Sequence, residues 1–352
     1  PQPQPQATEP VPIKVEPLTE PAAEPEWEPG IRYMTNSELA CFRRCKRKWW
    51  LAFYRKLKLR FEDPTGVRGL GTRLHVALAD WYSPGNKDPM QSLLESFKQD
   101  REFLLSLTQD PEVPFDLTEK LSDLDKDEAY GVAMLEGYFQ WLRETGADEG
   151  LRILGSEQRV TVRSSVPGVA LTGKLDVRIR REQDQARLFM DHKSVGNFTE
   201  PARILHMDRQ MLHYHLLEFM KFLEEGASAE DADRSRTDGG LYNMLRRVKR
   251  TAAANPPFYQ RLEVRHSINE LRSYWLRVHG EIKDIVELEQ RLLNGEDPRY
   301  AAYPTPKRDC TWDCDYMLIC PMFDDGSRVE DLITQYYDQY DPMARYADAK
   351  EV

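Results

Sequence analysis

The feature that most constrains the fold is a change of hydrophobic period at residue 151. Before this point the apolar residues mostly recur at helical spacing, whereas over 151–195 they recur at nearly every second position. This pattern predicts three consecutive strands, over 151–163, 170–180 and 187–193, separated by short polar turns. We therefore predict an α/β (mixed α+β) fold in which one sheet is flanked by helices.

Each predicted strand carries an acidic residue, and the third strand also carries a lysine. Glu157, Asp176 and Asp191 lie on successive strands, and Lys193 follows two positions after Asp191. Because neighbouring strands lie about 5 Å apart, acidic side chains on one face of a sheet can converge on one ion. Carboxylate oxygens are the ligands that Mg2+ prefers, and phosphodiester hydrolysis needs such an ion with a cation near the attacking water. The pattern predicts a metal-dependent nuclease site.

Helices predicted on either side of these strands contribute further polar residues. A helix over 68–82 carries His75, and a helix over 203–224 carries Gln210 and Tyr214, which lie one turn apart and share a face. Taken alone, a histidine among leucines is more typical of a core residue, and the glutamine and tyrosine are typical of a polar helix face. The order of all these residues along the chain favours one shared site.

In chain order, these residues resemble the RecB-like branch of the PD-(D/E)xK nuclease superfamily. The resemblance covers residues 37–322 and rests on Gly71-x3-His75, Glu157, Gly173-x-Leu175-Asp176, Asp191-x-Lys193-Ser194 and Gln210-x3-Tyr214. It implies a restriction-endonuclease-like core that holds Mg2+ or Mn2+ through His75, Asp176, Asp191 and the backbone carbonyl of His192. It also implies that Gln210 and Tyr214 contact the DNA strand. The implied catalytic set is Lys193, Asp191, Asp176 and Glu157, in which Lys193 orients or helps to deprotonate the attacking water.

Five cysteines lie at the two ends of this region, Cys41 and Cys45 before it and Cys310, Cys314 and Cys320 after it. One early cysteine with a late triplet resembles the iron–sulfur branch of the family, which includes AddB-type and CRISPR-associated RecB-like exonucleases. The resemblance implies that Cys45, Cys310, Cys314 and Cys320 hold a [4Fe-4S] cluster that ties the two ends together. The first gap of the triplet is three residues, where two is usual in that branch. Zinc on the same four thiolates and unliganded reduced cysteines are the alternatives.

The stretch 41–60 holds nine basic residues and no acidic one, in a chain whose net charge is −10. Such a stretch is typical of a surface that binds phosphate, and the DNA-binding residues predicted in it are Arg43, Arg44, Arg47 and Lys48. A solvated helix face is the alternative interpretation. The negative charge is concentrated at the ends, because residues 1–30 and residues 321–352 each carry −5.

These features divide the chain into three parts. Residues 1–30 are rich in Pro, Glu and Gln and are predicted to be a disordered tail, residues 31–322 a nuclease domain, and residues 323–352 an acidic C-terminal tail. The tails could dock a protein partner or simply aid solubility. The sequence contains no apolar run long enough to cross a bilayer and no secretion signal, so we expect no membrane partner and a cytoplasmic location.

Together these features predict a Mg2+- or Mn2+-dependent DNA exonuclease that acts on single-stranded or free DNA ends in recombination, repair or a related processing pathway. Phage recombination, host repair and CRISPR adaptation all use nucleases of the resembled family. One alternative is a DNA-end-binding adaptor that keeps the nuclease fold without activity. The other is a CRISPR-adaptation nuclease that trims spacer precursors.

Overall fold

A computed structural model describes residues 27–83, 87–110, 112–224, 226, 238–249, 253–347 and 349. Residues 1–26 of the predicted N-terminal tail therefore lie outside the described residues. Within the described residues, no helix is both long and apolar enough to cross a membrane.

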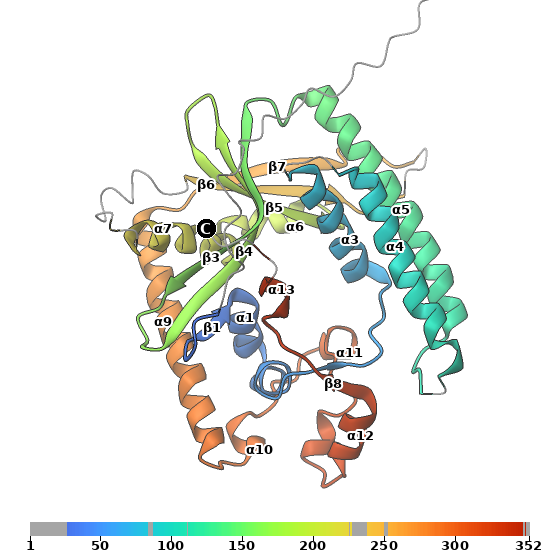
Figure 1. The fold of residues 1–352 in the computed structure, drawn as a ribbon, viewed down its shortest axis with the longest axis vertical. Helices are drawn as coiled ribbons and strands as arrows, with labels where there is room; N and C mark the ends of the chain where they lie inside the picture. Colours follow the sequence, from blue (N-terminus) through green and yellow to red (C-terminus); the bar gives the residue numbers. More distant parts are fainter. Residues whose placement is uncertain are drawn as a thin grey trace, which may run out of the picture.

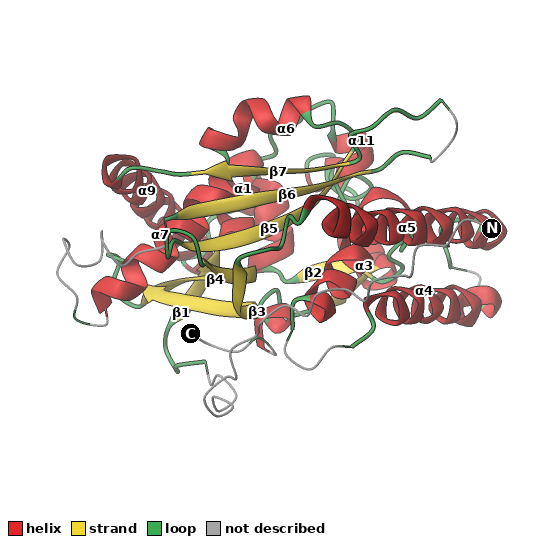
Figure 2. Cartoon of the chain, turned by 90° about the horizontal axis from the view of Figure 1, so that it is seen from above, coloured by secondary structure: helices red, strands yellow, loops and turns green. Residues whose placement is uncertain are grey.

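A mixed sheet of six strands forms the centre of the described chain (Figure 1, Figure 2). Five strands run in the order β1-β4-β5-β6-β7, and β3 pairs with β4 off this path. The pairs β1·β4 and β5·β6 are parallel, and the other pairs are antiparallel. The strands are β1 (Arg32–Thr35), β3 (Leu151–Arg163), β4 (Val169–Arg181), β5 (Arg187–Val195), β6 (Gly239–Arg246) and β7 (Tyr259–Val264). The prediction of a mixed α/β sheet flanked by helices is confirmed.

The long strand β4 is paired differently along its two edges. One edge pairs with β3 over nearly the whole strand. The other edge pairs with β1 over 169–172 and with β5 over 177–180, so the ladder of described strands is interrupted at 173–176. At the end of this interruption, the backbone N–H of His192 donates to the side chain of Asp176 at 2.8 Å. The sheet thus opens at the position of Asp176.

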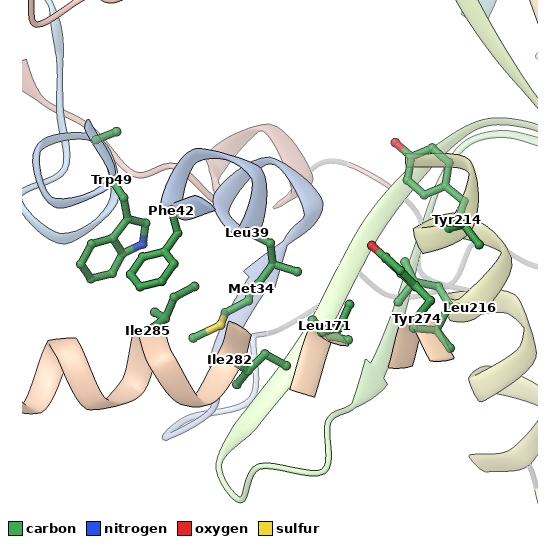
Figure 3. Packing of buried hydrophobic residues seen from close by; sticks show 14 of the residues in the cluster. Met34, Leu39, Phe42, Trp49, Leu171, Tyr214, Leu216, Tyr274, Ile282 and Ile285 are labelled. Carbon is green, nitrogen blue, oxygen red and sulfur yellow. The ribbon is translucent and has the colours of Figure 1, made fainter. Parts of the chain in front are cut away.

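Helices cover both faces of the sheet (Figure 2). One face packs against α1 (Asn36–Arg44), α7 (Arg209–Glu224) and α9 (Ile268–Leu293), and the other against α3 (Gly66–Trp81), α4 (Pro89–Ser106) and α5 (Leu117–Thr145). Met34, Leu39, Leu171 and Ile282 belong to the first of these two cores, where β1, α1, β4 and α9 meet (Figure 3). The short helical segments are α2 (Lys46–Trp49), η1 (Trp50–Tyr54), η2 (Leu107–Gln109), α6 (Thr199–Ile204), η3 (Leu205–Met207), α10 (Pro298–Ala301), α11 (Cys310–Asp313) and η4 (Pro321–Phe323).

The segment predicted as an acidic tail folds against the rest of the protein as far as it is described. α12 (Val329–Tyr336) leads into β8 (Tyr337–Gln339), which pairs antiparallel with β2 (Leu57–Leu59), and α13 (Ala344–Ala347) follows. Acidic residues of this segment meet the basic stretch: Asp324 pairs with Arg47 at 3.2 Å, Glu330 with Arg55 at 2.8 Å and Asp338 with Arg60 at 3.1 Å. The structure therefore corrects the expectation of a tail from residue 323, because charge complementarity between distant segments is not visible in local composition.

Candidate active site

A cavity of about 890 Å3 lies where the sheet is interrupted. It brings together residues from α3, β3, β4, β5 and α7, among them six of those predicted for the site: His75, Glu157, Asp176, Lys193, Gln210 and Tyr214. Asp191 and His192 do not line the cavity but lie buried next to its lining residues, and they are only 1% and 2% exposed. The cavity also contains Arg68, Arg345 and Tyr346, which the sequence did not indicate.

His75 on α3 contacts Asp176 on β4, with 3.3 Å between its Nδ1 and the carboxylate. Burial opposes a charge on Asp176, but His75, His192 and Lys193 outweigh burial and lower the pKa of this carboxyl below its usual value. Burial also opposes a charge on His75, yet the nearby Asp176 raises the pKa of the imidazole. The contact therefore favours the charged forms of both groups.

Two side chains hold the buried carboxylate of Asp191 on β5. Lys193 Nζ lies 2.7 Å from one oxygen, and the amide nitrogen of Gln210 donates to the other at 3.1 Å. Gln210 also donates to the hydroxyl of Tyr214 at 2.9 Å, so the pair on α7 shares one face, as its spacing predicted. Burial raises the pKa of Asp191. Burial would lower the pKa of Lys193, but Asp191 and Asp176 raise it above its usual value.

Two glycines of the motifs allow the helices to approach the sheet. A Cβ at Gly71 would lie 3.3 Å from the hydroxyl oxygen of Ser194, a tight contact that a small shift would have to relieve. A Cβ at Gly173 would lie 2.7 Å from a methyl carbon of Leu217 on α7, so that the leucine side chain would have to move. Glycine at these two positions leaves room for the close approach of α3 and α7 to the sheet.

Glu157 on β3 adopts a backbone conformation that residues other than glycine rarely adopt, with φ of 52°. The strand register places it opposite Asp176. Its carboxylate forms an ion pair with Lys174, and burial raises its pKa. Backbone strain of this kind persists only where surrounding contacts hold it, and it is enriched at functional sites.

A buried polar network that the sequence did not indicate lies beside His192. The side-chain amide of Asn243 donates to Nδ1 of His192 at 2.9 Å, and Arg261 donates to the amide oxygen of Asn243 at 2.9 Å. Arg261 also pairs with Asp148 at 2.7 Å and donates to the hydroxyl of Tyr138 at 2.6 Å. Burial lowers the pKa of His192 to about 3, so its imidazole is neutral. The network anchors β5 between the two residues that carry the site's charge.

The side chains predicted to bind a metal are not gathered into one group. Among the described residues, no three His, Cys, Asp or Glu side chains lie close enough together to hold an ion. Carboxylates nevertheless suit Mg2+ and Mn2+, and Asp176 and Asp191 supply two. One oxygen of Asp191 is buried and has no hydrogen-bond partner in the described chain, although the charge of Lys193 lies 2.7 Å away. The donor chemistry fits such an ion, and ligation by His75, Asp176, Asp191 and the carbonyl of His192 stays a prediction.

Backbone N–H groups are directed at two of the predicted cysteine ligands. The thiol of Cys45 accepts from the N–H of Lys48 at 3.5 Å and from that of Thr305 at 3.4 Å. The thiol of Cys310 accepts from the N–H of Lys307 at 3.3 Å. Such contacts stabilise a thiolate and are the outer contacts expected around a metal-bound cysteine.

The remaining cysteines belong to the same neighbourhood. Burial raises the pKa of Cys320 to about 11, with contributions from Cys45 and Cys314. Burial raises the pKa of Cys41 to about 12, and Cys45 and Cys314 contribute to this shift too. All five cysteines are free thiols. Because Cys41 also lies near the late triplet, the structure does not by itself single out Cys45 as the early ligand.

The basic residues predicted to bind DNA are occupied within the protein. Three of them contact groups from the later part of the chain: Arg43 pairs with Glu281 at 2.6 Å, Arg44 with Asp309 at 3.0 Å, and Lys48 donates to the carbonyl of Asp313 at 2.9 Å. Arg47 is 1% exposed and donates to the carbonyl of Ala302 at 2.9 Å. This corrects the prediction that Arg47 contacts DNA, because an enclosed side chain cannot reach a phosphate.

Comparison with known proteins adds evidence on the family. The family model described as the PD-(D/E)XK nuclease superfamily matches residues 33–321, a range that contains every residue predicted for the nuclease site and all five cysteines. No curated protein matches the sequence. Among solved structures, the crystal structure of SSO0001 matches at 13% identity, over 64% of this chain and 94% of that chain, with a TM-score of 0.28.

Proposed function

The chain belongs to the PD-(D/E)XK nuclease superfamily, and we propose that it is a Mg2+- or Mn2+-dependent deoxyribonuclease that degrades DNA from single-stranded ends. The observation that carries this proposal is that Asp176 and Lys193 line one cavity and that Lys193 also contacts the buried carboxylate of Asp191 directly behind it. A structural role alone would not require two carboxylates and a lysine to converge where a substrate can enter.

The residues of the cavity have distinct proposed roles. His75, Asp176 and Asp191 would hold the metal, which when bound supplies a Lewis acid and an activated water. The ammonium of Lys193 is placed beside these carboxylates to stabilise negative charge that develops on the phosphate. Gln210 keeps Asp191 oriented through its amide, 3.1 Å from the carboxylate. Glu157, opposite Asp176, adds a third carboxylate for the same chemistry.

A second cavity, of about 570 Å3, supports a single strand as the substrate. It shares Ser37 and Arg68 with the first cavity and is lined by the half-buried aromatic side chains of Phe53 and Tyr340. Aromatic side chains stack on unpaired bases of any sequence, whereas the bases of a duplex are already stacked on each other. We infer that the strand continues from the active-site cavity toward this second cavity.

The test of the proposed function is cleavage of end-labelled single- and double-stranded DNA by the full chain with Mg2+, Mn2+ or EDTA. We expect metal-dependent shortening of the single strand, lost in Asp191→Asn. The matched control is Asp80→Asn, because Asp80 lines the same cavity but accepts a hydrogen bond from Ser92. Full cleavage by Asp191→Asn would overturn the assignment of the site.

A DNA-end-binding protein without nuclease activity is the second candidate. One observation favours it: in the described chain, no three His, Cys, Asp or Glu side chains lie close enough together to hold a metal ion. Such a protein would bind single-stranded DNA with the usual salt dependence and would not cleave it in any metal. The same assay separates the two candidates when binding and cleavage are measured on one sample.

We also propose that Cys45, Cys310, Cys314 and Cys320 hold a [4Fe-4S] cluster, with zinc on the same thiolates as the alternative. The N–H contacts to Cys45 and Cys310 support a thiolate site. Because residues 45 and 310 are far apart in sequence, a metal that joins them would contribute to folding stability. Iron and zinc contents of anaerobically purified protein test this proposal. We expect iron to be lost in Cys320→Ala and retained in the control Cys41→Ala, and full iron content in Cys320→Ala would exclude it.

A further inference from the structure

We propose that the C-terminal segment, residues 340–347, completes the substrate site and that Arg345 binds a backbone phosphate of the DNA strand in the active-site cavity. This inference rests on the proposed function, because it names a contact of the same substrate. It concerns a part of the chain beyond the family match, which ends at residue 321.

The C-terminal segment is held in place by contacts on both sides of Arg345. Before it, β8 pairs with β2, and the N–H of Tyr340 donates to the carbonyl of Lys56 at 2.9 Å. After it, Tyr346 is 5% exposed, and Arg159 donates to its backbone carbonyl at 3.3 Å. Figure 1 shows α13 next to α1 in the middle of the molecule. The C-terminal segment is therefore held in a fixed position in the lining of the active-site cavity.

Arg345 differs from the other arginine that lines this cavity. Arg68 pairs with Asp313 and with Asp315, the latter at 3.3 Å. Arg345 is exposed and makes no ion pair with any acidic residue in the described part of the chain. An unneutralised guanidinium in a cavity that also holds Lys193 attracts an anion, and the anion that a nuclease brings there is a phosphate.

The guanidinium of Arg345 is oriented before any substrate arrives. Its Nη2 donates to the hydroxyl of Ser37 at 2.9 Å and to the hydroxyl of Tyr346 at 2.5 Å. Both hydrogens of Nη2 are thus used, and the N–H groups of Nε and Nη1 are left to donate to phosphate oxygens, each on its own side of the guanidinium. Because the guanidinium is already fixed, binding a phosphate costs little further side-chain entropy.

The experiment compares Arg345→Ala and Arg345→Lys with the wild type, by titration of an end-labelled single-stranded oligonucleotide at several salt concentrations in EDTA, and by cleavage kinetics with Mn2+. We expect Arg345→Ala to weaken binding roughly tenfold, as for one lost charge-assisted bond. The slope of log affinity against log salt should fall by about 0.7, as for one phosphate of a single strand. KM should rise while kcat changes little. Arg345→Lys should keep the slope and recover only part of the affinity.

The matched control is Arg328→Ala, which removes another exposed arginine of the C-terminal region, paired with Asp331 on α12. It should leave binding, slope and cleavage unchanged. Unchanged affinity and slope in Arg345→Ala would overturn the inference, and faster cleavage by this variant would overturn it too, because the side chain would then obstruct the site. If the wild type binds but never cleaves, the proposed function fails alone, and the binding slopes still decide the role of Arg345.

Discussion

The two groups of basic residues in this protein have different surroundings. The stretch 41–60 is the densest positive region of the sequence, yet its arginines pair with acidic residues that lie more than 200 positions later, as in Arg43 with Glu281 and Arg55 with Glu330. Of the lysines and arginines that line the cavity, Lys193 contacts Asp191 yet keeps 26% of its side chain exposed, and Arg345 pairs with no acidic residue of the described chain. A dense run of charge here joins distant parts of the fold, whereas the bases proposed to act on substrate come singly from separate segments.

The largest expected effect is the loss of cleavage in Lys193→Ala. Removing the cation that stabilises charge on the phosphate should lower kcat by a factor on the order of 10³, the cost of losing one preorganised group of this kind. Single-turnover cleavage with Mn2+ measures it, and binding in EDTA should change by far less. Arg55→Ala, which removes a base of the same stretch that lines neither cavity, is the control and should cleave normally. Near-normal cleavage by Lys193→Ala would contradict the proposal that Lys193, unlike the bases of the stretch 41–60, acts on the substrate.

Arg47→Met is expected to act on stability instead of on DNA. Methionine fills the space, but the carbonyls of Ala302 and Cys320 lose their donor, and each unsatisfied buried group is costly, so the free energy of unfolding should fall by about 2–3 kcal/mol. Urea denaturation followed by circular dichroism measures this change. Arg55→Ala is the matched control, because its partner Glu330 is 65% exposed and such a pair contributes less than about 1 kcal/mol. Equal stability of both variants, with weaker DNA binding in Arg47→Met, would contradict the structural role.

The elements of this fold that sequence could predict are those with a local signal. The strands predicted over 151–163, 170–180 and 187–193 are β3, β4 and β5 within two residues at each end, because their alternation depends only on near neighbours. The start of α9 also has a local signal, because Ser267 and Glu270 form a capping box whose hydrogen bonds span only three residues. The cavity likewise brings together the side chains whose order along the chain carried the family resemblance.

The parts that sequence did not predict depend on partners far away in the chain. Asn243 and Arg261 look like ordinary strand residues until β6 and β7 place them beside His192 and Tyr138. Arg345 lies in a segment that reads as an acidic tail, and contacts with distant parts of the chain, such as the one with Ser37 some 300 positions earlier, bring it to the cavity. Local composition could not distinguish paired from unpaired bases, because both groups share the same residue types.

A smaller effect is expected from Asp313→Asn, which makes the two groups of bases more alike. Asp313 pairs with both Arg44 and Arg68 at the edge of the second cavity, so its amide variant leaves each of these cations with one acidic partner in place of two. Affinity for a single-stranded oligonucleotide should rise by roughly two- to fivefold at low salt, and the salt dependence should steepen. Fluorescence anisotropy measures both quantities. Asp338→Asn, beside Arg60 and away from the cavities, serves as the control.

The smallest effect is expected from Arg44→Ala, although the sequence placed this residue among the DNA-binding bases. Its charge is already neutralised by Asp309 and Asp313, so Arg44 attracts a DNA phosphate only weakly. Its removal should change the affinity for DNA by less than about twofold. Stability should fall by no more than about 1 kcal/mol, because both acids remain partly exposed, at 38% and 36%. The two groups of bases can be compared by the ratio of the affinity losses for single-stranded DNA in Arg345→Ala and Arg44→Ala, measured under the same conditions. A ratio well above one means that an unpaired cation in the cavity matters more than dense paired charge, and a ratio near one means that the strand displaces Asp309 and Asp313 when it binds.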